Sequence, residues 1–126
     1  MNNERDKIKY SLDFLIPVDW ILDIARRSTD SSDERHRVLG KAILDFTKIA
    51  HLTKDNLIQD KDTDLAPYLD FWFGDAIDIA KASLKDGDSN LRTLAECVID
   101  QEKSVVKSKE AFLREVKRVS GSRNEH

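Results

Sequence analysis

The fold is decided by residues 89–119, SNLRTLAECVIDQEKSVVKSKEAFLREVKRV, the longest uninterrupted helical pattern in the chain. Apolar residues recur in it at intervals of seven, at Leu91, Val98, Val105, Phe112 and Val119. The spacing predicts one helix of about 46 Å at 1.5 Å per residue, longer than a compact domain of this size is wide. Positions that would complete a coiled-coil seam are polar, Gln101 and Ser108 among them, so we expect only partial burial.

The charge of the chain changes sign inside this helix. Residues 1–102 carry a net charge of −7 and residues 103–126 a net charge of +4, against −3 for the whole chain. This distribution leaves two arrangements open for the helix. Either it lies along its own bundle with its charged side in solvent, or its distal half past about residue 103 projects and pairs with an acidic partner surface or a second copy.

Helical periodicity dominates the rest of the chain as well, and there is no convincing strand pattern. Further helices are predicted at about 4–15, 17–27, 32–52 and 65–85, with residues 53–64 as a linker. The predicted fold class is therefore all-α: a four- to five-helix bundle with a long C-terminal helix. It forms a single helical domain over residues 1–119, followed by a frayed polar tail at 120–126.

Local signals predict where these helices begin. Pro17 interrupts the first pattern and suits the first position of the second helix. Ser31, with a glutamate three residues later, has the spacing of a capping box for the third helix. Asp64 precedes the fourth helix, and Asp88 or Ser89 precedes the last one, where each is expected to cap the backbone N–H groups.

Two glycines carry structural expectations. Gly87 follows the 65–85 pattern and predicts a C-terminal glycine cap. Gly40 lies inside the 32–52 pattern, where glycine costs about 1 kcal/mol relative to alanine, and such a glycine often marks close contact between helices.

Composition excludes several classes of protein. A chain of 126 residues with 40% hydrophobic residues can fold without disulfides or a metal. Cys97 is the only cysteine, which excludes an internal disulfide framework and favours a reducing compartment. The N-terminus is polar and the longest fully apolar runs are about three residues, so we expect a cytoplasmic protein with no membrane partner.

No catalytic, cofactor or metal motif of high specificity is present, so no catalytic residue, cofactor or metal ligand is assigned. Asp75 and Asp78 share a helix face, and together with Glu96 and Asp100 they could build an Mg²⁺-dependent all-α nucleotide hydrolase. The more ordinary interpretation is that these four carboxylates face solvent. Cys97 is expected to be a small core residue rather than a nucleophile.

The aromatic run 71–73, Phe-Trp-Phe, is the feature most suggestive of recognition. Three consecutive helical residues spread over about 200° of the helix surface, so all three cannot face one core. Trp72 falls on the main apolar stripe, which leaves Phe71 or Phe73 at its margin, near Tyr68. Either a second layer of the bundle covers this margin or it is an exposed anchor.

These observations predict a small protein–protein interaction module without catalytic activity, such as an adaptor, inhibitor, immunity-type or accessory subunit. Its partner is a protein, with a homodimer through the last helix also possible. Two binding surfaces are predicted: an aromatic margin (Tyr68, Phe71, Phe73) and the distal last helix (Phe112, Arg114, Lys117, Arg118).

Two alternatives stay open. The first is a nucleic-acid-associated small subunit that uses the basic helix, although the whole chain is acidic and has no recognised nucleic-acid motif. The second is the Mg²⁺-dependent nucleotide hydrolase.

Overall fold

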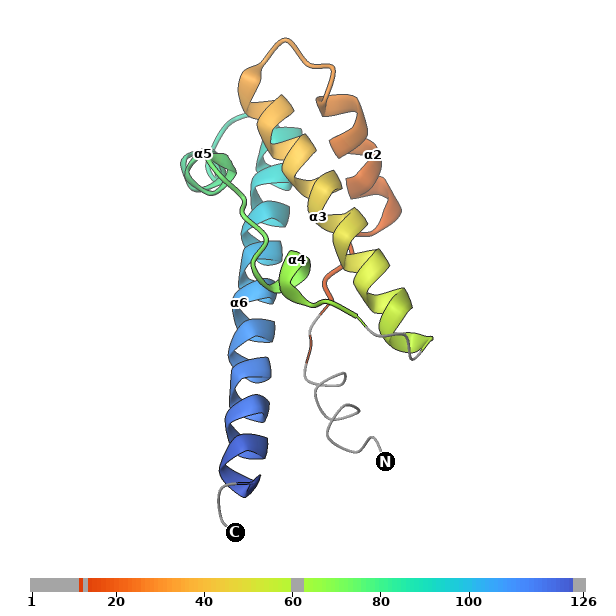
Figure 1. Ribbon diagram of the computed structural model, residues 1–126. Helices are drawn as coiled ribbons and strands as arrows, with labels where there is room; N and C mark the ends of the chain where they lie inside the picture. The colour runs from red at the N-terminus through yellow and green to blue at the C-terminus, as the bar shows by residue number, and fades with distance from the viewer. Residues whose placement is uncertain (1–11, 13, 60–62, 124–126) are drawn as a thin grey trace.

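The computed structural model describes residues 12, 14–59 and 63–123, and these residues form an all-α fold without strands (Figure 1). The helices are α2 (Asp19–Ser28), α3 (Glu34–Ile58), α4 (Ala66–Leu69), α5 (Ala76–Ser83) and α6 (Ser89–Arg123). The predicted fold class, with its long C-terminal helix, is confirmed.

Helices α2, α3 and α6 form the main layer, and the short α4 and α5 lie on it (Figure 1). α2 packs against α3, α3 packs against α6, and α5 packs against α6. The core has two parts. The upper cluster includes Leu39, Ile43, Leu94 and Val98. The lower cluster is aromatic and centres on Phe46 and Tyr68.

The close contact suggested by Gly40 is confirmed. A Cβ atom at this position would lie 2.6 Å from the backbone oxygen of Ala25 and 3.1 Å from Cβ of Ser28. Only a glycine lets α2 and α3 approach this closely, so here the helix cost of glycine is offset by packing.

The third predicted helix begins and ends later than expected. Asp33, and not Ser31, is its N-cap, because the Asp33 side chain accepts a hydrogen bond from the backbone N–H of Arg35. α3 then continues to Ile58, through the first half of the predicted 53–64 linker. Thr53 and Leu57 are buried on its inner side, and this burial stabilises the extra turns.

The first two predicted helices are only partly correct. Most of the 4–15 segment lies outside the described residues, and residues 12 and 14–17 are not helical. α2 begins at Asp19, so Pro17 precedes the helix and Val18 is its N-cap. Val18, as the N-cap residue, lies outside the helix and is exposed.

The predicted helix 65–85 is wrong over its middle third. α4 ends at Leu69, the chain runs through residues 70–75 without helix, and α5 begins at Ala76. Gly74 has φ of 61° in this segment, the left-handed region that glycine adopts at low cost, and there the chain turns into α5. The predicted cap is partly confirmed: Asp64 accepts a hydrogen bond from Ala66 N–H, although Leu65 is the N-cap residue and Pro67 lies in the first turn of α4.

Gly87 is not the expected glycine cap. α5 ends at Ser83, its C-cap is Leu84 in a right-handed helical conformation, and φ of Gly87 is not positive. Asp86 organises this loop instead, because its side chain accepts a hydrogen bond from the N–H of Asp88.

The last helix runs to Arg123, so part of the tail expected to fray is helical. Asp88 caps its start and accepts from the N–H groups of Asn90 and Leu91 at 2.9 and 3.2 Å, as predicted. Gln101 and Ser108 are fully buried, against the expectation that polar residues would leave this side exposed.

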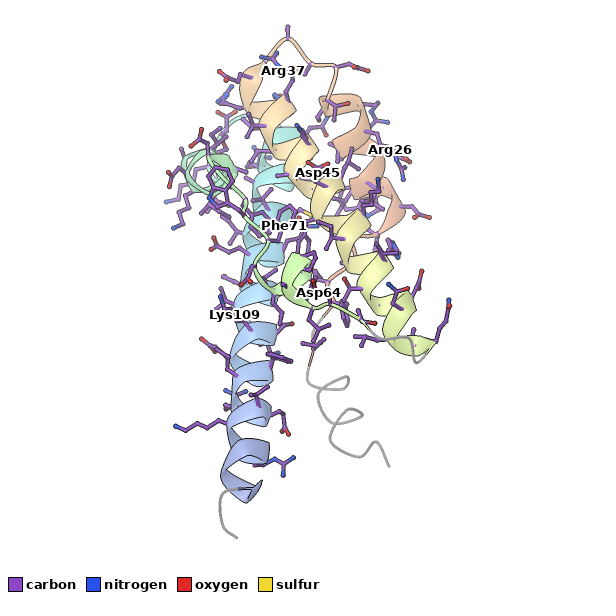
Figure 2. All side chains as sticks on the ribbon, in the orientation of Figure 1. Arg26, Arg37, Asp45, Asp64, Phe71 and Lys109 are labelled. Atoms are coloured by element: carbon purple, nitrogen blue, oxygen red, sulfur yellow. The ribbon has the colours of Figure 1, made fainter. Side chains whose placement is uncertain are left out.

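The first arrangement describes only part of this helix, and pairing of its distal half with a partner stays a prediction. Up to about Lys109 it lies along the bundle, and beyond that point it extends past the other described helices (Figures 1 and 2).

Candidate protein-interaction surface

An open groove of about 480 Å³ lies between the 69–77 segment and the middle of α6. Its lining includes three aromatic residues from the segment and three residues from α6: Phe71, Trp72, Phe73, Glu102, Val106 and Lys109. We call it the Trp72 groove. It joins the predicted aromatic run to the middle of the last helix, whereas the predicted distal residues of that helix (Phe112, Arg114, Lys117, Arg118) are not on its lining.

Stacked aromatic rings hold the segment that forms one wall of the groove. The Phe46 ring, on α3, lies 5.2 Å from Phe71 and 5.4 Å from Phe73. Phe71 and Phe73 contact each other edge to face at 4.8 Å. Figure 2 shows Phe71 directed into the body of the protein. Such ring pairs add about 0.5–1.5 kcal/mol each beyond burial, so the segment is anchored.

Trp72 points out of the body because residues 71–73 are not helical. Phe71 and Phe73 pack their rings against Phe46 on the core side, while Trp72 between them faces solvent. Its exposed fraction is 86%, the largest among the exposed hydrophobic residues in the described part of the chain. Gly74 lies beside the indole, since a Cβ on it would be 3.7 Å from the ring.

The predicted aromatic margin therefore has to be corrected. Tyr68 is completely buried, and Phe71 and Phe73 are half-buried with their rings against Phe46. Trp72, which the helical pattern had directed inward, is the exposed residue of the aromatic run.

Polar residues edge the groove. Lys109 Nζ lies 3.1 Å from Oδ1 of Asp70 and links α6 to the loop across it. Both side chains are at least half exposed, so this ion pair contributes little to stability but keeps Lys109 neutralised. Glu102 adds a second carboxylate and makes no ion pair with any residue that the structure describes.

An exposed apolar stripe continues from the groove along α6. Val106, Leu113 and Val116 have exposed fractions of 49%, 54% and 38%. With Glu102 and Lys109 they are spaced four, three, four and three residues apart, so all five lie on one side of the helix. This stripe lies next to the buried one that includes Leu91, Val98 and Val105.

The predicted distal residues occupy three different environments. Phe112 is half-buried and packs against the lower core cluster. Arg118 is exposed and forms a 3.0 Å ion pair with Glu115 one turn earlier. Arg114 and Lys117 are exposed and make no ion pair within residues 12, 14–59 and 63–123.

The carboxylates of the hydrolase alternative do not form a metal centre. Asp75 is the N-cap of α5, Asp78 lies in its first turn, and Glu96 and Asp100 are exposed on α6. Among the described residues, no group of three or more acidic, histidine or cysteine side chains is close enough to hold a metal ion.

Cys97 is a buried core residue, as its place in the helical pattern predicted. Burial raises the pKa of its thiol to about 12, with a smaller contribution from Asp100. The thiolate form that a nucleophile needs is therefore disfavoured at neutral pH.

Sequence reasoning missed a polar junction at the top of the bundle. His36 Nε2 lies 3.2 Å from Oδ2 of Asp88, and His36 Nδ1 lies 3.4 Å from Oδ2 of Asp33. Asp33 and Asp88 cap α3 and α6, so one histidine connects the starts of the two longest helices. Arg35 adds ion pairs to Asp33 and Asp86.

The caps and the arginine shift the carboxyl groups of this junction. The Arg35 side chain holds the pKa of Asp33 well below its usual range. Backbone N–H donors lower the pKa of Asp86 and Asp88 in the same direction. The carboxylates are engaged by helix N–H groups and by Arg35, so we assign the junction a structural role.

The comparisons with other proteins add no identification. No protein-family model, curated protein or solved structure matches this chain at a significant level. None of the described helices has the length and apolar character needed to cross a bilayer.

Proposed function

We propose that this protein is a non-catalytic protein-interaction module that binds a helical segment of a partner chain in the Trp72 groove. The observation that carries the proposal is the placement of Trp72. It is 86% exposed, yet the half-buried residues on either side hold its backbone in place. Tryptophan is the residue most enriched at interface hot spots, and an anchored backbone lowers the entropy cost of binding.

The walls of the groove suggest the chemistry of the partner. Glu102 lines it without an ion pair to a described residue, and the only described lysine on its lining, Lys109, is already paired with Asp70. An amphipathic helix with apolar residues on one side and cations beside them would complement this surface. We expect the partner segment to be basic.

Cytoplasmic location and the absence of catalytic activity are parts of the same proposal. A single buried thiol suits a reducing compartment. The shortage of convergent titratable groups in the described residues supports a binding role over chemistry.

A nucleic-acid-associated subunit is the second candidate, and one observation favours it. Lys103, Lys107, Arg114 and Lys117 are exposed on α6 and make no ion pair with described residues. Binding through them would weaken steeply with salt and would not depend on Trp72.

The test is a titration of the full chain with a designed basic amphipathic peptide of about 16 residues and with an acidic counterpart that has glutamate for lysine. Isothermal titration calorimetry should show the basic peptide binding at least about tenfold more tightly than the acidic one. Trp72→Ala should weaken binding of the basic peptide at least about tenfold, because it removes the anchor.

Trp20→Ala is the matched control, because Trp20 is also exposed but lies on α2, outside the groove. It should leave the affinity unchanged. Equal losses in the two tryptophan variants, or no preference between the peptides, would contradict the proposal.

A further inference from the structure

We infer that the helix entering the Trp72 groove is the distal part of α6 from a second copy of this chain, so that two copies pair antiparallel through α6. The inference rests on the proposed function and names the partner of the same groove. Each copy offers one groove and one distal helix, which is what a two-fold symmetric interface requires.

The groove-lining residues of α6 and the distal apolar residues lie on the same side of the helix. Glu102, Val106 and Lys109 line the groove, and Leu113 and Val116 continue their stripe toward the C-terminus. The stripe alternates steps of four and three residues, the spacing of a coiled-coil seam. One side of a single helix can therefore hold both halves of the interface.

The antiparallel direction follows from the positions along the helix. Val106 and Leu113 lie at equal distances from the point between Lys109 and Glu110. A two-fold axis there places Val106 of one copy against Leu113 of the other, and brings the end of each stripe near the exposed Trp72 of the other copy. The apolar contact along the stripe is Val106 with Leu113 and its symmetry mate, while Val116 falls opposite Lys103.

Charge selects the same arrangement. With this axis Glu102 of one copy lies opposite Lys117 of the other, and neither residue has an ion-pair partner among the described residues of its own chain. In a parallel pair, Arg114 and Lys117 of one copy would face Arg114 and Lys117 of the other, and the like charges would repel. Lys109, close to the axis, is already neutralised by Asp70 at 3.1 Å.

The described helices do not cover the last turns of α6, where the second copy would lie (Figure 2). Beyond Lys109 the helix runs past the described ends of α3 and α4 (Figure 2). Its length of 35 residues corresponds to about 52 Å, so its last turns stand clear of the described helices.

The experiment is sedimentation equilibrium of the full chain from about 1 to 300 µM, with four variants compared under identical conditions. The wild type should give a mass twice that of the 14.5 kDa chain at the upper concentrations. Glu102→Lys and Lys117→Glu should each raise the dimer dissociation constant at least about tenfold, and the double variant should return it to within about threefold of wild type.

Lys107→Glu is the control, because it makes the same charge change on α6 but Lys107 is not one helical turn from any stripe residue, whereas Lys117 lies one turn after Leu113. It should leave the dissociation constant within about threefold of wild type. Circular dichroism of every variant checks that the helical content is unchanged.

Three results would overturn the inference: a monomer at every concentration, a dimer that ignores both charge reversals, or a double variant that is no better than the single ones. A monomer that still binds the basic peptide through Trp72 would leave the proposed function standing and would mean that the partner is a different protein. Loss of both dimer and peptide binding would reject the two together.

Discussion

Single residues decide the closest contacts in this protein. Gly40 and Gly87 differ in how closely other atoms approach them. A Cβ on Gly40 would meet the Ala25 backbone oxygen at 2.6 Å, whereas a Cβ on Gly87 would meet nothing within 4 Å. Trp72 is a second case, since the backbone around it is not helical and a tryptophan expected on an apolar stripe lies at the surface.

The glycine pair gives a matched test of packing. Gly40→Ala should destabilise the protein by about 1 kcal/mol or more, because the cost of forcing α2 and α3 apart exceeds the helix preference of alanine. Gly87→Ala should be neutral or stabilise by about 0.5 kcal/mol, because it only restricts the unfolded chain. Urea unfolding measures both, and equal effects would show that the contact at Gly40 is not tight.

At the scale of elements, the structure depends on how helices begin. Asp33 and Asp88 cap α3 and α6, and His36 lies between the two caps. The carboxyl groups of Asp33, Asp86 and Asp88 all have lowered pKa values. These carboxyl groups bind protons more readily in the unfolded chain than in the folded chain. The free energy of unfolding therefore rises with pH between the lowered pKa values and the ordinary aspartate pKa.

We therefore expect stability to be lost as pH falls below the ordinary aspartate pKa of 3.8 and through the lowered values. Asp88→Asn should flatten this loss, because asparagine still caps the helix but does not titrate. The urea midpoint measured from pH 7 to pH 2 checks the prediction.

Asp100→Asn is the comparison variant for this experiment. Asp100 is exposed and makes no hydrogen bond or ion pair with the described residues, so its loss should leave the pH dependence unchanged. An unchanged profile in Asp88→Asn would mean that the α6 cap does not contribute to acid sensitivity.

At the scale of the whole molecule, α6 has two roles. Its first part completes both core clusters, with Leu94 and Val98 in the upper one and Val105 in the lower one. Its last part carries an exposed apolar stripe and basic residues beyond the other described helices (Figure 1).

Two truncations should separate these roles. A chain ending after Glu102 loses the buried Val105 and the half-buried Phe112, which should cost about 3 kcal/mol or more and remove the cooperative thermal transition. A chain ending after Leu113 keeps both residues and should melt cooperatively. Circular dichroism melts test this, and cooperative melting of the shorter chain would show that the distal helix is dispensable for the core.

The sequence alone determined the all-α class, the long last helix, a cap at Asp88 or Ser89, the buried state of Cys97 and the importance of the aromatic run. These follow from periodicity and capping, which depend on neighbours close in the chain. Tertiary contacts decided the rest. The rings of Phe71 and Phe73 pack on Phe46, which keeps residues 70–75 out of a helix and turns Trp72 outward. Gln101 is buried beside Thr47, and its Nε2 donates a hydrogen bond to Thr47 Oγ1 at 3.2 Å. Residues 54 positions apart make that bond, and no local pattern encodes such a partner.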